Sequence, residues 1–74
     1  MNVQIVMDQA GDTRHEFDPA NADAVIRAEE RFRALTGKGF RAVALGKDGQ
    51  PGALMRDFDA SAEQTLFIPQ LQGG

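Results

Sequence analysis

The residues best suited to chemistry stand at the end of the chain, in the segment Gln70-Leu71-Gln72-Gly73-Gly74. This segment has no charge and ends in two residues without side chains, so we expect its terminal carboxylate to be mobile and unhindered. A glycine carboxylate can enter a narrow active site in which a Cβ atom would clash. The tail therefore suits activation by another enzyme, first with ATP and then with a thiol. The alternative is that the two glycines are only a frayed end.

Other side chains offer little for catalysis. His15 lies on the predicted strand face that also carries Phe17, which is typical of a half-buried structural histidine. Ser61 lacks the Gly-x-Ser-x-Gly frame of an activated nucleophile. Asp57 and Asp59 are two positions apart and could share a strand face, but nothing marks either as an acid or a base. We therefore expect that the chain is not an enzyme.

Two lysines follow glycines, in Gly37-Lys38-Gly39 and in Gly46-Lys47-Asp48. Neither segment has the Ser or Thr after the lysine, or the earlier glycine, of a phosphate-binding loop. Turn formation explains these glycines, and we expect no bound nucleotide. The chain has no cysteine, which excludes a disulfide, a thiolate nucleophile and cysteine-ligated zinc. We expect no metal and no cofactor.

Length and charge restrict the class of protein further. A chain of 74 residues has room for one small domain, so a two-domain enzyme is excluded. It carries 8 basic and 11 acidic residues, a net charge of −3, which makes nucleic acids and anionic membranes poor partners. No apolar run reaches half of the roughly 20 residues of a membrane span, and no export signal is present. We expect a cytoplasmic protein that is a monomer when free.

The first half of the chain predicts a hairpin followed by a helix. Residues 2–7 alternate, and we expect Val3, Ile5 and Met7 to face the core. A turn at residues 8–12 leads into a strand over residues 13–17, with Thr13, His15 and Phe17 on one side. Asp18-Pro19 is a helix-start signal, and Asn21 is a second possible cap. From Ala22 the apolar residues recur at helical spacing, at Val25, Ala28, Phe32 and Leu35.

The second half predicts strands. Gly37 and Gly39 end the helix, and residues 40–45 form a short apolar strand. Residues 46–52 hold three glycines and a proline, which predicts a loop. A short strand over 53–58, a turn over 59–63 and a last strand over 64–68 follow, and we expect Pro69 to end the sheet. This order predicts an α+β fold in which one helix covers a sheet of four or five strands.

Several short matches along the chain, in the same order, resemble ubiquitin and the ubiquitin-like β-grasp proteins over almost its whole length. They are Gln4-Ile5, Gly11, Thr13, Glu16, Asp18-Pro19, Arg41 to Lys47, Asp57-Phe58, Thr65-Leu66 and Leu71-x-Gly73-Gly74. The resemblance implies a β-grasp domain over residues 1–69, with a mixed sheet, and a flexible tail over residues 70–74. It also implies a protein modifier of a bacterial-type conjugation system.

The family resemblance implies a role for each residue of the tail. An E1-like enzyme would use ATP to adenylate the Gly74 carboxylate, which would pass to a thiol and then to a lysine of a target protein. Gly73 would provide clearance, and Gln70, Leu71 and Gln72 would contact the partner. The further partners implied are an E2-like conjugating enzyme and a JAB-type deconjugating protease.

The resemblance also implies a recognition surface at Val43 and Ile68, although ordinary burial in the sheet is the alternative for Val43. Lys47 matches a lysine that accepts a further copy of the modifier, and Lys38 is the other lysine of the chain. Both could instead be solvated loop residues.

The tail departs from ubiquitin in two ways. Gln70 and Gln72 stand in place of two arginines, and Pro69 is expected to end backbone pairing early. Residues 67–74 look equally like the ends of the sulfur carriers of molybdopterin and thiamin synthesis, which end as a thiocarboxylate. Three functions stay open: a covalent modifier, a sulfur carrier, and an interaction domain that offers a sheet edge to partners while its tail stays idle.

Overall fold

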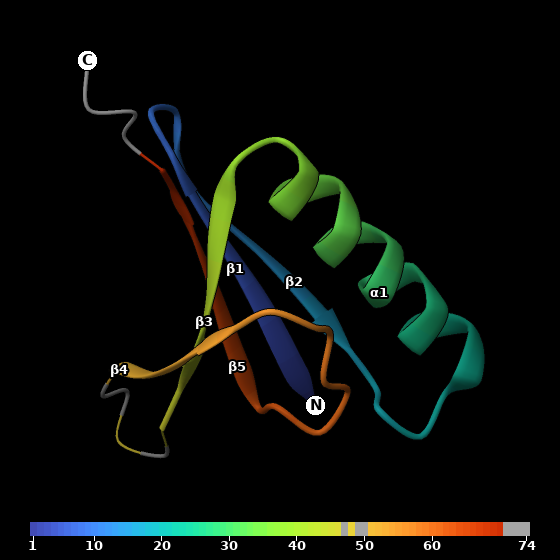
Figure 1. The fold of residues 1–74 in the computed structure, drawn as a ribbon. Coiled ribbons are helices and arrows are strands. Elements are labelled where there is room, and N and C mark those ends of the chain that lie inside the picture. Colours follow the sequence, from blue (N-terminus) through green and yellow to red (C-terminus); the bar gives the residue numbers. More distant parts are fainter. Residues whose placement is uncertain (47, 49–50, 71–74) are drawn as a thin grey trace.

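The computed structural model describes residues 1–46, 48 and 51–70. Its elements are, in chain order, β1 (Asn2–Asp8), β2 (Gly11–Phe17), α1 (Ala22–Gly37), β3 (Phe40–Leu45), β4 (Pro51–Met55) and β5 (Gln64–Pro69). They form an α+β fold in which α1 lies across one face of a five-stranded sheet (Figure 1). The predicted class and element order are confirmed. In the described part of the chain, no helix is long and apolar enough to cross a membrane.

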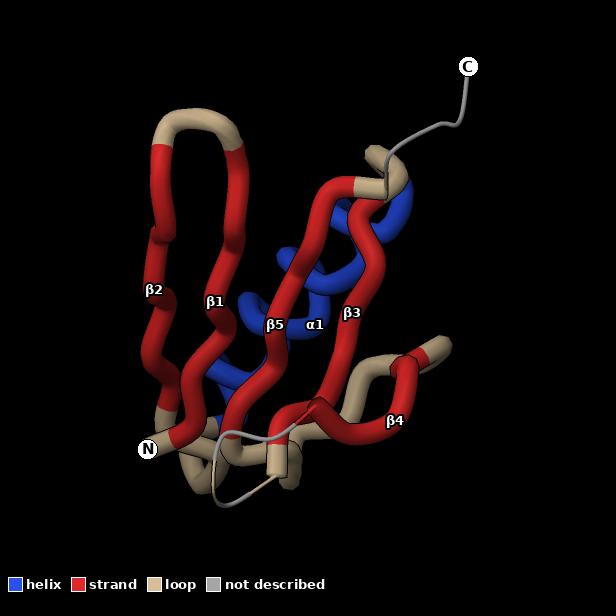
Figure 2. The backbone as a smooth tube through the Cα atoms, turned by 90° about the vertical axis from the view of Figure 1, so that its left-hand side faces the viewer, coloured by secondary structure: helices blue, strands red, loops and turns tan. Residues whose placement is uncertain are grey.

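The last strand of the chain lies in the middle of the sheet, whose order is β2-β1-β5-β3-β4 (Figure 2). β5 pairs parallel to β1 on one side and antiparallel to β3 on the other. The two outer strands, β2 and β4, pair antiparallel to β1 and β3. The sheet is therefore mixed, and its edges are one strand from each hairpin.

The predicted β-hairpin is confirmed. β1 and β2 pair without a break from Asn2 opposite Phe17 to Asp8 opposite Gly11. At the turn, the Ala10 N–H donates to Oδ1 of Asp8 at 2.8 Å. Gly11 has a φ of 119°, a conformation that side chains disfavour, which explains the glycine at this position.

The prediction that Val3, Ile5 and Met7 face the core holds for Val3, which is buried, but not for Ile5, which is half-buried, or for Met7, which is 39% exposed. The opposite face of β1 meets the helix, because the side chain of Gln4 reaches the backbone of α1 and Val6 joins the buried core. Successive residues of a strand point to opposite faces, so the three predicted residues lie on the face that α1 does not cover. Both faces of β1 carry apolar residues, so alternation alone could not decide between them.

The helix begins and ends close to the predicted positions. Asn21 is the N-cap, and its side chain accepts from the Ala24 N–H at 3.2 Å. Asp18 instead accepts from the Ala20 N–H and stabilises the preceding turn. At the other end, the Lys38 N–H donates to the carbonyls of Ala34 and Leu35, and Gly39 follows with a φ of 101°.

The core lies between the helix and β1, β3 and β5. Its buried residues are Val6, Phe32, Ala42 and Phe67, with Leu35, Phe40, Met55 and Phe58 packed against them. The ring of Phe32 meets the rings of Phe67 and Phe58 edge-on, with centroids 5.8 and 6.0 Å apart. These rings account for much of the apolar area that the small domain buries.

A fully buried glutamine fixes the helix over β1. The side-chain Nε2 of Gln4 donates to the Ala28 carbonyl at 2.9 Å, and its Oε1 accepts from Arg31 at 2.9 Å. Gln4 has no exposed surface, so losing either partner would leave a buried polar atom unpaired. The helix therefore has a defined position along the strand.

β4 differs from its prediction at both ends, since it covers Pro51–Met55 instead of residues 53–58. Proline and glycine are tolerated here because β4 is an edge strand. The register between β3 and β4 shifts between Val43 and Leu45, where β4 carries one extra residue. After Met55 the chain turns, and the Phe58 ring packs against Phe17 and Phe32 on the helix side.

Replacing Gly52 by alanine is expected to destabilise the fold. A Cβ atom at this position would overlap the Ala44 carbonyl oxygen, which is held in β3. We predict that G52A lowers the free energy of unfolding by about 1–3 kcal/mol in chemical denaturation. The matched variant is G37A, since nothing lies near a Cβ at Gly37, and it should change stability by less than about 1 kcal/mol. Equal stability of G52A and the wild type would contradict this packing.

Candidate functional site

The root of the C-terminal tail is anchored in the middle of the sheet. Pro69 pairs with Phe40, and the Gln70 N–H donates to the Gly39 carbonyl at 3.3 Å. The prediction that Pro69 ends the pairing is therefore wrong. Proline lacks only its own N–H, and the next residue, Gln70, continues the pairing with Gly39, which directly precedes β3. The tail leaves the domain from a fixed point.

Most of the predicted tail residues lie outside the described part of the chain. Gln70 is described and is exposed. Leu71, Gln72, Gly73 and Gly74, like the possible acceptor Lys47, fall outside the described residues.

The tail root borders the face of the sheet that α1 does not cover, here called the open face. Strand alternation places ten residues of β1, β3, β4 and β5 on it: Val3, Ile5, Met7, Arg41, Val43, Leu45, Leu54, Gln64, Leu66 and Ile68. Eight of them are apolar. Val3 is buried and several others are half-buried, whereas Leu54 is 55% exposed and Ile68 is 39% exposed.

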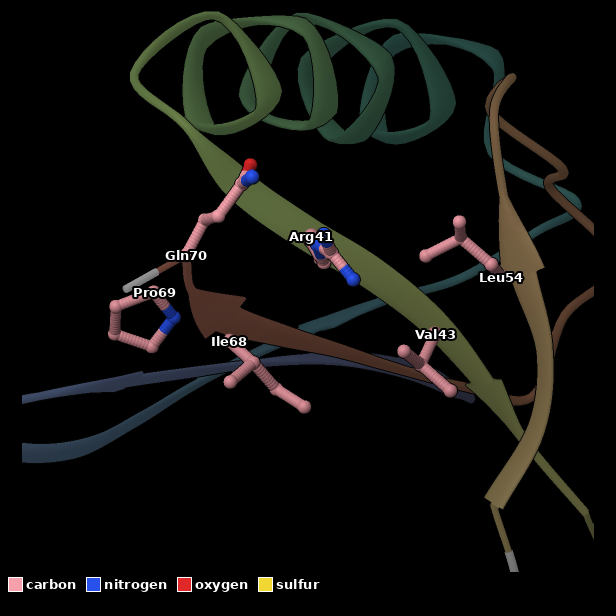
Figure 3. A pocket seen from close by; sticks show the side chains of 6 residues that line it. All are labelled: Arg41, Val43, Leu54, Ile68, Pro69 and Gln70. Carbon is pink, nitrogen blue, oxygen red and sulfur yellow. The ribbon is translucent and has the colours of Figure 1, made fainter. Parts of the chain in front are cut away.

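The predicted surface residues Val43 and Ile68 line the same hollow on the open face (Figure 3). Val43 of β3 lies opposite Leu54 of β4, and Ile68 of β5 lies opposite Arg41 of β3. The hollow encloses about 440 Å³ and is also lined by Pro69 and Gln70, so it reaches the tail root.

A second hollow adjoins the first at Ile68 and Pro69. Its other wall is the β1–β2 turn, with Met7, Asp8 and Gln9. Among the described residues, Arg41 is the one charged side chain that lines the first hollow, and Asp8 is the one that lines the second. The tail root therefore lies on an apolar surface, between the positive charge of Arg41 and the negative charge of Asp8.

Sequence reasoning missed Arg41, Leu54 and Met7 as parts of this surface. The alternation of Arg41, Val43 and Leu45 could have placed Arg41 on the same face as Val43. Leu54 could not be found in this way, because its face depends on the irregular register between β3 and β4.

The other candidates for chemistry lie apart from the tail root. Ser61 Oγ donates to Oδ1 of Asp59 at 2.6 Å, and hydrogen bonds from Ser61 lower the pKa of Asp59. Both residues are exposed in a turn. Asp57 and Asp59 lie outside the strands, so the suggestion that they share a strand face is wrong. Within the described ranges, no group of His, Cys, Asp and Glu is arranged to hold a metal ion.

His15 is half-buried, as expected, on the strand face toward α1. It lies opposite Gln4, and partial burial lowers its pKa, with a smaller contribution from the positive charge of Arg31. A neutral histidine that packs beside a structural hydrogen bond is consistent with a structural role.

Comparisons of the chain with protein families, with curated proteins and with solved structures give no match.

The pKa of His15 predicts how stability depends on pH. Because the folded state holds this pKa below its ordinary value, the unfolded chain binds the proton more strongly. His15 therefore makes the protein less stable as the pH falls from about 7.5 through about 6.5. We predict that H15Q, compared with the wild type in urea titrations across this range, shows a weaker loss of stability. The same pH slope in both proteins would contradict the assignment.

Proposed function

We propose that this chain is a ubiquitin-like protein modifier with a β-grasp fold. Its Gly74 carboxylate is adenylated by an E1-like enzyme, carried as a thioester and joined to lysines of target proteins in a bacterial-type conjugation system. The observation that best supports this proposal is the central position of β5. The chain end leaves the domain from a pinned root beside an exposed apolar hollow.

In this proposal the activating enzyme binds the hollow and takes the tail into its active site. An enzyme that draws the tail into its active site must also contact the surface around the tail root. Exposed Ile68 and Leu54 provide apolar area for that contact, while Arg41 provides one charge for orientation. The end of the tail, Gly73-Gly74, has no side chain to obstruct a narrow channel.

The chemistry proceeds by one substitution at phosphorus followed by two acyl substitutions. The Gly74 carboxylate attacks the α-phosphorus of ATP and releases pyrophosphate, which gives an acyl adenylate. A thiolate of the enzyme displaces AMP to form a thioester, and a lysine amine of the target displaces the thiolate to form an amide. This chain supplies only the acyl group, so no catalytic residue of its own is required.

A sulfur carrier is the alternative, favoured by Pro69 and the uncharged Gln70 at the tail root. It would share the adenylation step, but a sulfide-equivalent donor would then displace AMP and leave a thiocarboxylate on Gly74. The two functions therefore differ in the product and not in the surface that the activating enzyme uses.

Removal of Gly73 and Gly74 is predicted to abolish activation without unfolding the domain, because the core lies within residues 3–67. An N-terminally tagged chain and its truncated variant would be produced in the native cell and compared on denaturing blots. Circular dichroism would verify the fold of both. Higher-mass adducts are expected only for the full chain. Equal adducts from both would contradict the proposal, and their absence from both would favour a non-covalent interaction domain.

The open face is predicted to be needed for conjugation. A charge at Ile68 would disrupt apolar contact with the activating enzyme, so I68R should reduce adduct formation in the same cells by tenfold or more, roughly the loss of one strong interface contact. The matched control is I26R, because Ile26 is 53% exposed on the helix, away from the tail root. This variant should behave like the wild type. Equal effects of both substitutions would argue against the open face.

A further inference from the structure

The sheet has one long, regular edge at β2. This strand pairs over its whole length with β1 only. Within the described part of the chain, no loop or side chain hydrogen-bonds to Gly11–Phe17 from the other side. The opposite edge is less suited to pairing, because β4 has five residues, an irregular register and a proline without an N–H.

The charged residues of β2 direct their backbone N–H and C=O groups toward this free edge. The Val3 N–H donates to the Glu63 carbonyl, so the odd residues of β1 direct their backbone groups toward β5. The even residues of β1 therefore bond to β2, where their partners are Gly11, Thr13, His15 and Phe17. The N–H and C=O groups of Asp12, Arg14 and Glu16 point outward, without a partner among the described residues.

The charges of Asp12, Arg14 and Glu16 alternate in sign. Two copies of this edge can therefore place opposite charges beside each other, depending on the register in which they pair. An antiparallel pair of two copies centred on Arg14 would place Arg14 opposite Arg14 and Asp12 opposite Glu16, so like charges would meet. Centring the pair on His15 places Arg14 of each copy opposite Glu16 of the other.

A third register, centred on Thr13, would also pair opposite charges, Asp12 with Arg14. It requires the paired segment to include Gly11, whose φ of 119° departs from extended geometry. The register centred on His15 uses residues 13–17, which lie away from the turn. It offers about four backbone hydrogen bonds and two ion pairs.

We propose that two copies of this chain pair through β2 in this antiparallel, two-fold arrangement with His15 on the axis, which joins the two sheets edge to edge. The inference does not depend on the proposed function. The side chains of Arg14 and Glu16 lie at the β2 edge of the open face, and the inference uses neither the two hollows beside the tail root nor the tail.

The surroundings of His15 favour this register at neutral pH. The two His15 side chains would meet on the axis, each facing Gln4 of β1 and Arg31 of α1 within its own copy. Because burial and Arg31 lower the pKa of His15, the two imidazoles are neutral and do not repel each other. In this register the two His15 residues form a non-hydrogen-bonded pair of the antiparallel ladder, a position that brings side chains close together. Neutral imidazole rings can pack against each other there.

The contact is small, so the dimer is weak. Pairing over residues 13–17 buries much less than the roughly 1,200 Å² of a stable interface, and we expect a dissociation constant on the order of 0.1–1 mM. The expectation of a free monomer therefore applies at lower concentrations.

Cysteine crosslinking tests the register, because the chain has no cysteine of its own. In the proposed dimer the two Cα atoms at position 15 are about 4.5 Å apart, within disulfide range, whereas those at position 13 are about 14 Å apart. Under mild oxidation at about 0.5 mM, a concentration chosen from the expected affinity, H15C should crosslink at least tenfold faster than T13C and R14C. Equal rates, or faster crosslinking of T13C or R14C, would overturn the register.

Charge substitutions in the otherwise unmodified chain provide a second test, by sedimentation equilibrium up to about 1 mM. E16R should reduce association at least fivefold, and the double variant R14E/E16R should restore it. D12R is the matched control, since Asp12 lies beyond the paired residues and faces no positive charge of the other copy, and it should not weaken association. A wild type that stays monomeric throughout, or equal effects of D12R and E16R, would refute the proposal.

Discussion

One helix covers one face of a five-stranded sheet, and the other features of the molecule depend on this constraint. Gln4 fixes the helix over β1 with two hydrogen bonds, and the phenylalanine rings fill the space beneath it. With one helix in the described fold, the other face of the sheet keeps its apolar residues at the surface. In the proposed function, the same residues both stabilise the sheet and form the surface that the activating enzyme contacts.

The central position of β5 links that surface to the chain end. Because β5 pairs on both sides, its direction is fixed, and the Gln70–Gly39 hydrogen bond extends the fixed part to the tail root. A tail at an edge strand would leave beside solvent. Here it leaves beside Ile68 and the hollow that Val43 and Leu54 line. In the proposed function, recognition of the domain and delivery of the tail would therefore depend on one surface.

The sequence predicts those features that local physics determines. Residues 22–37 form a helix because apolar spacing and the Asn21 cap agree, and the first hairpin follows from alternation around a glycine turn. The core-facing side of β1 could not be predicted, because its choice depends on Gln4 finding partners in α1. The limits of β4 depend on its irregular pairing with β3, and the hollow at the tail root depends on the order of the strands, which spacing does not encode.

Peptide mass spectrometry of this protein, purified from its native cell under denaturing conditions, tests the modifier proposal most directly. Trypsin would leave residues 57–74 on an acceptor lysine, because Arg56 is the last basic residue, and cleavage after Leu71 would leave Gln72-Gly73-Gly74. The proposal predicts such branched peptides on lysines of other proteins. A free chain alone would contradict it, and a chain heavier by about 16 Da, the exchange of oxygen for sulfur at an activated carboxylate, would identify a sulfur carrier.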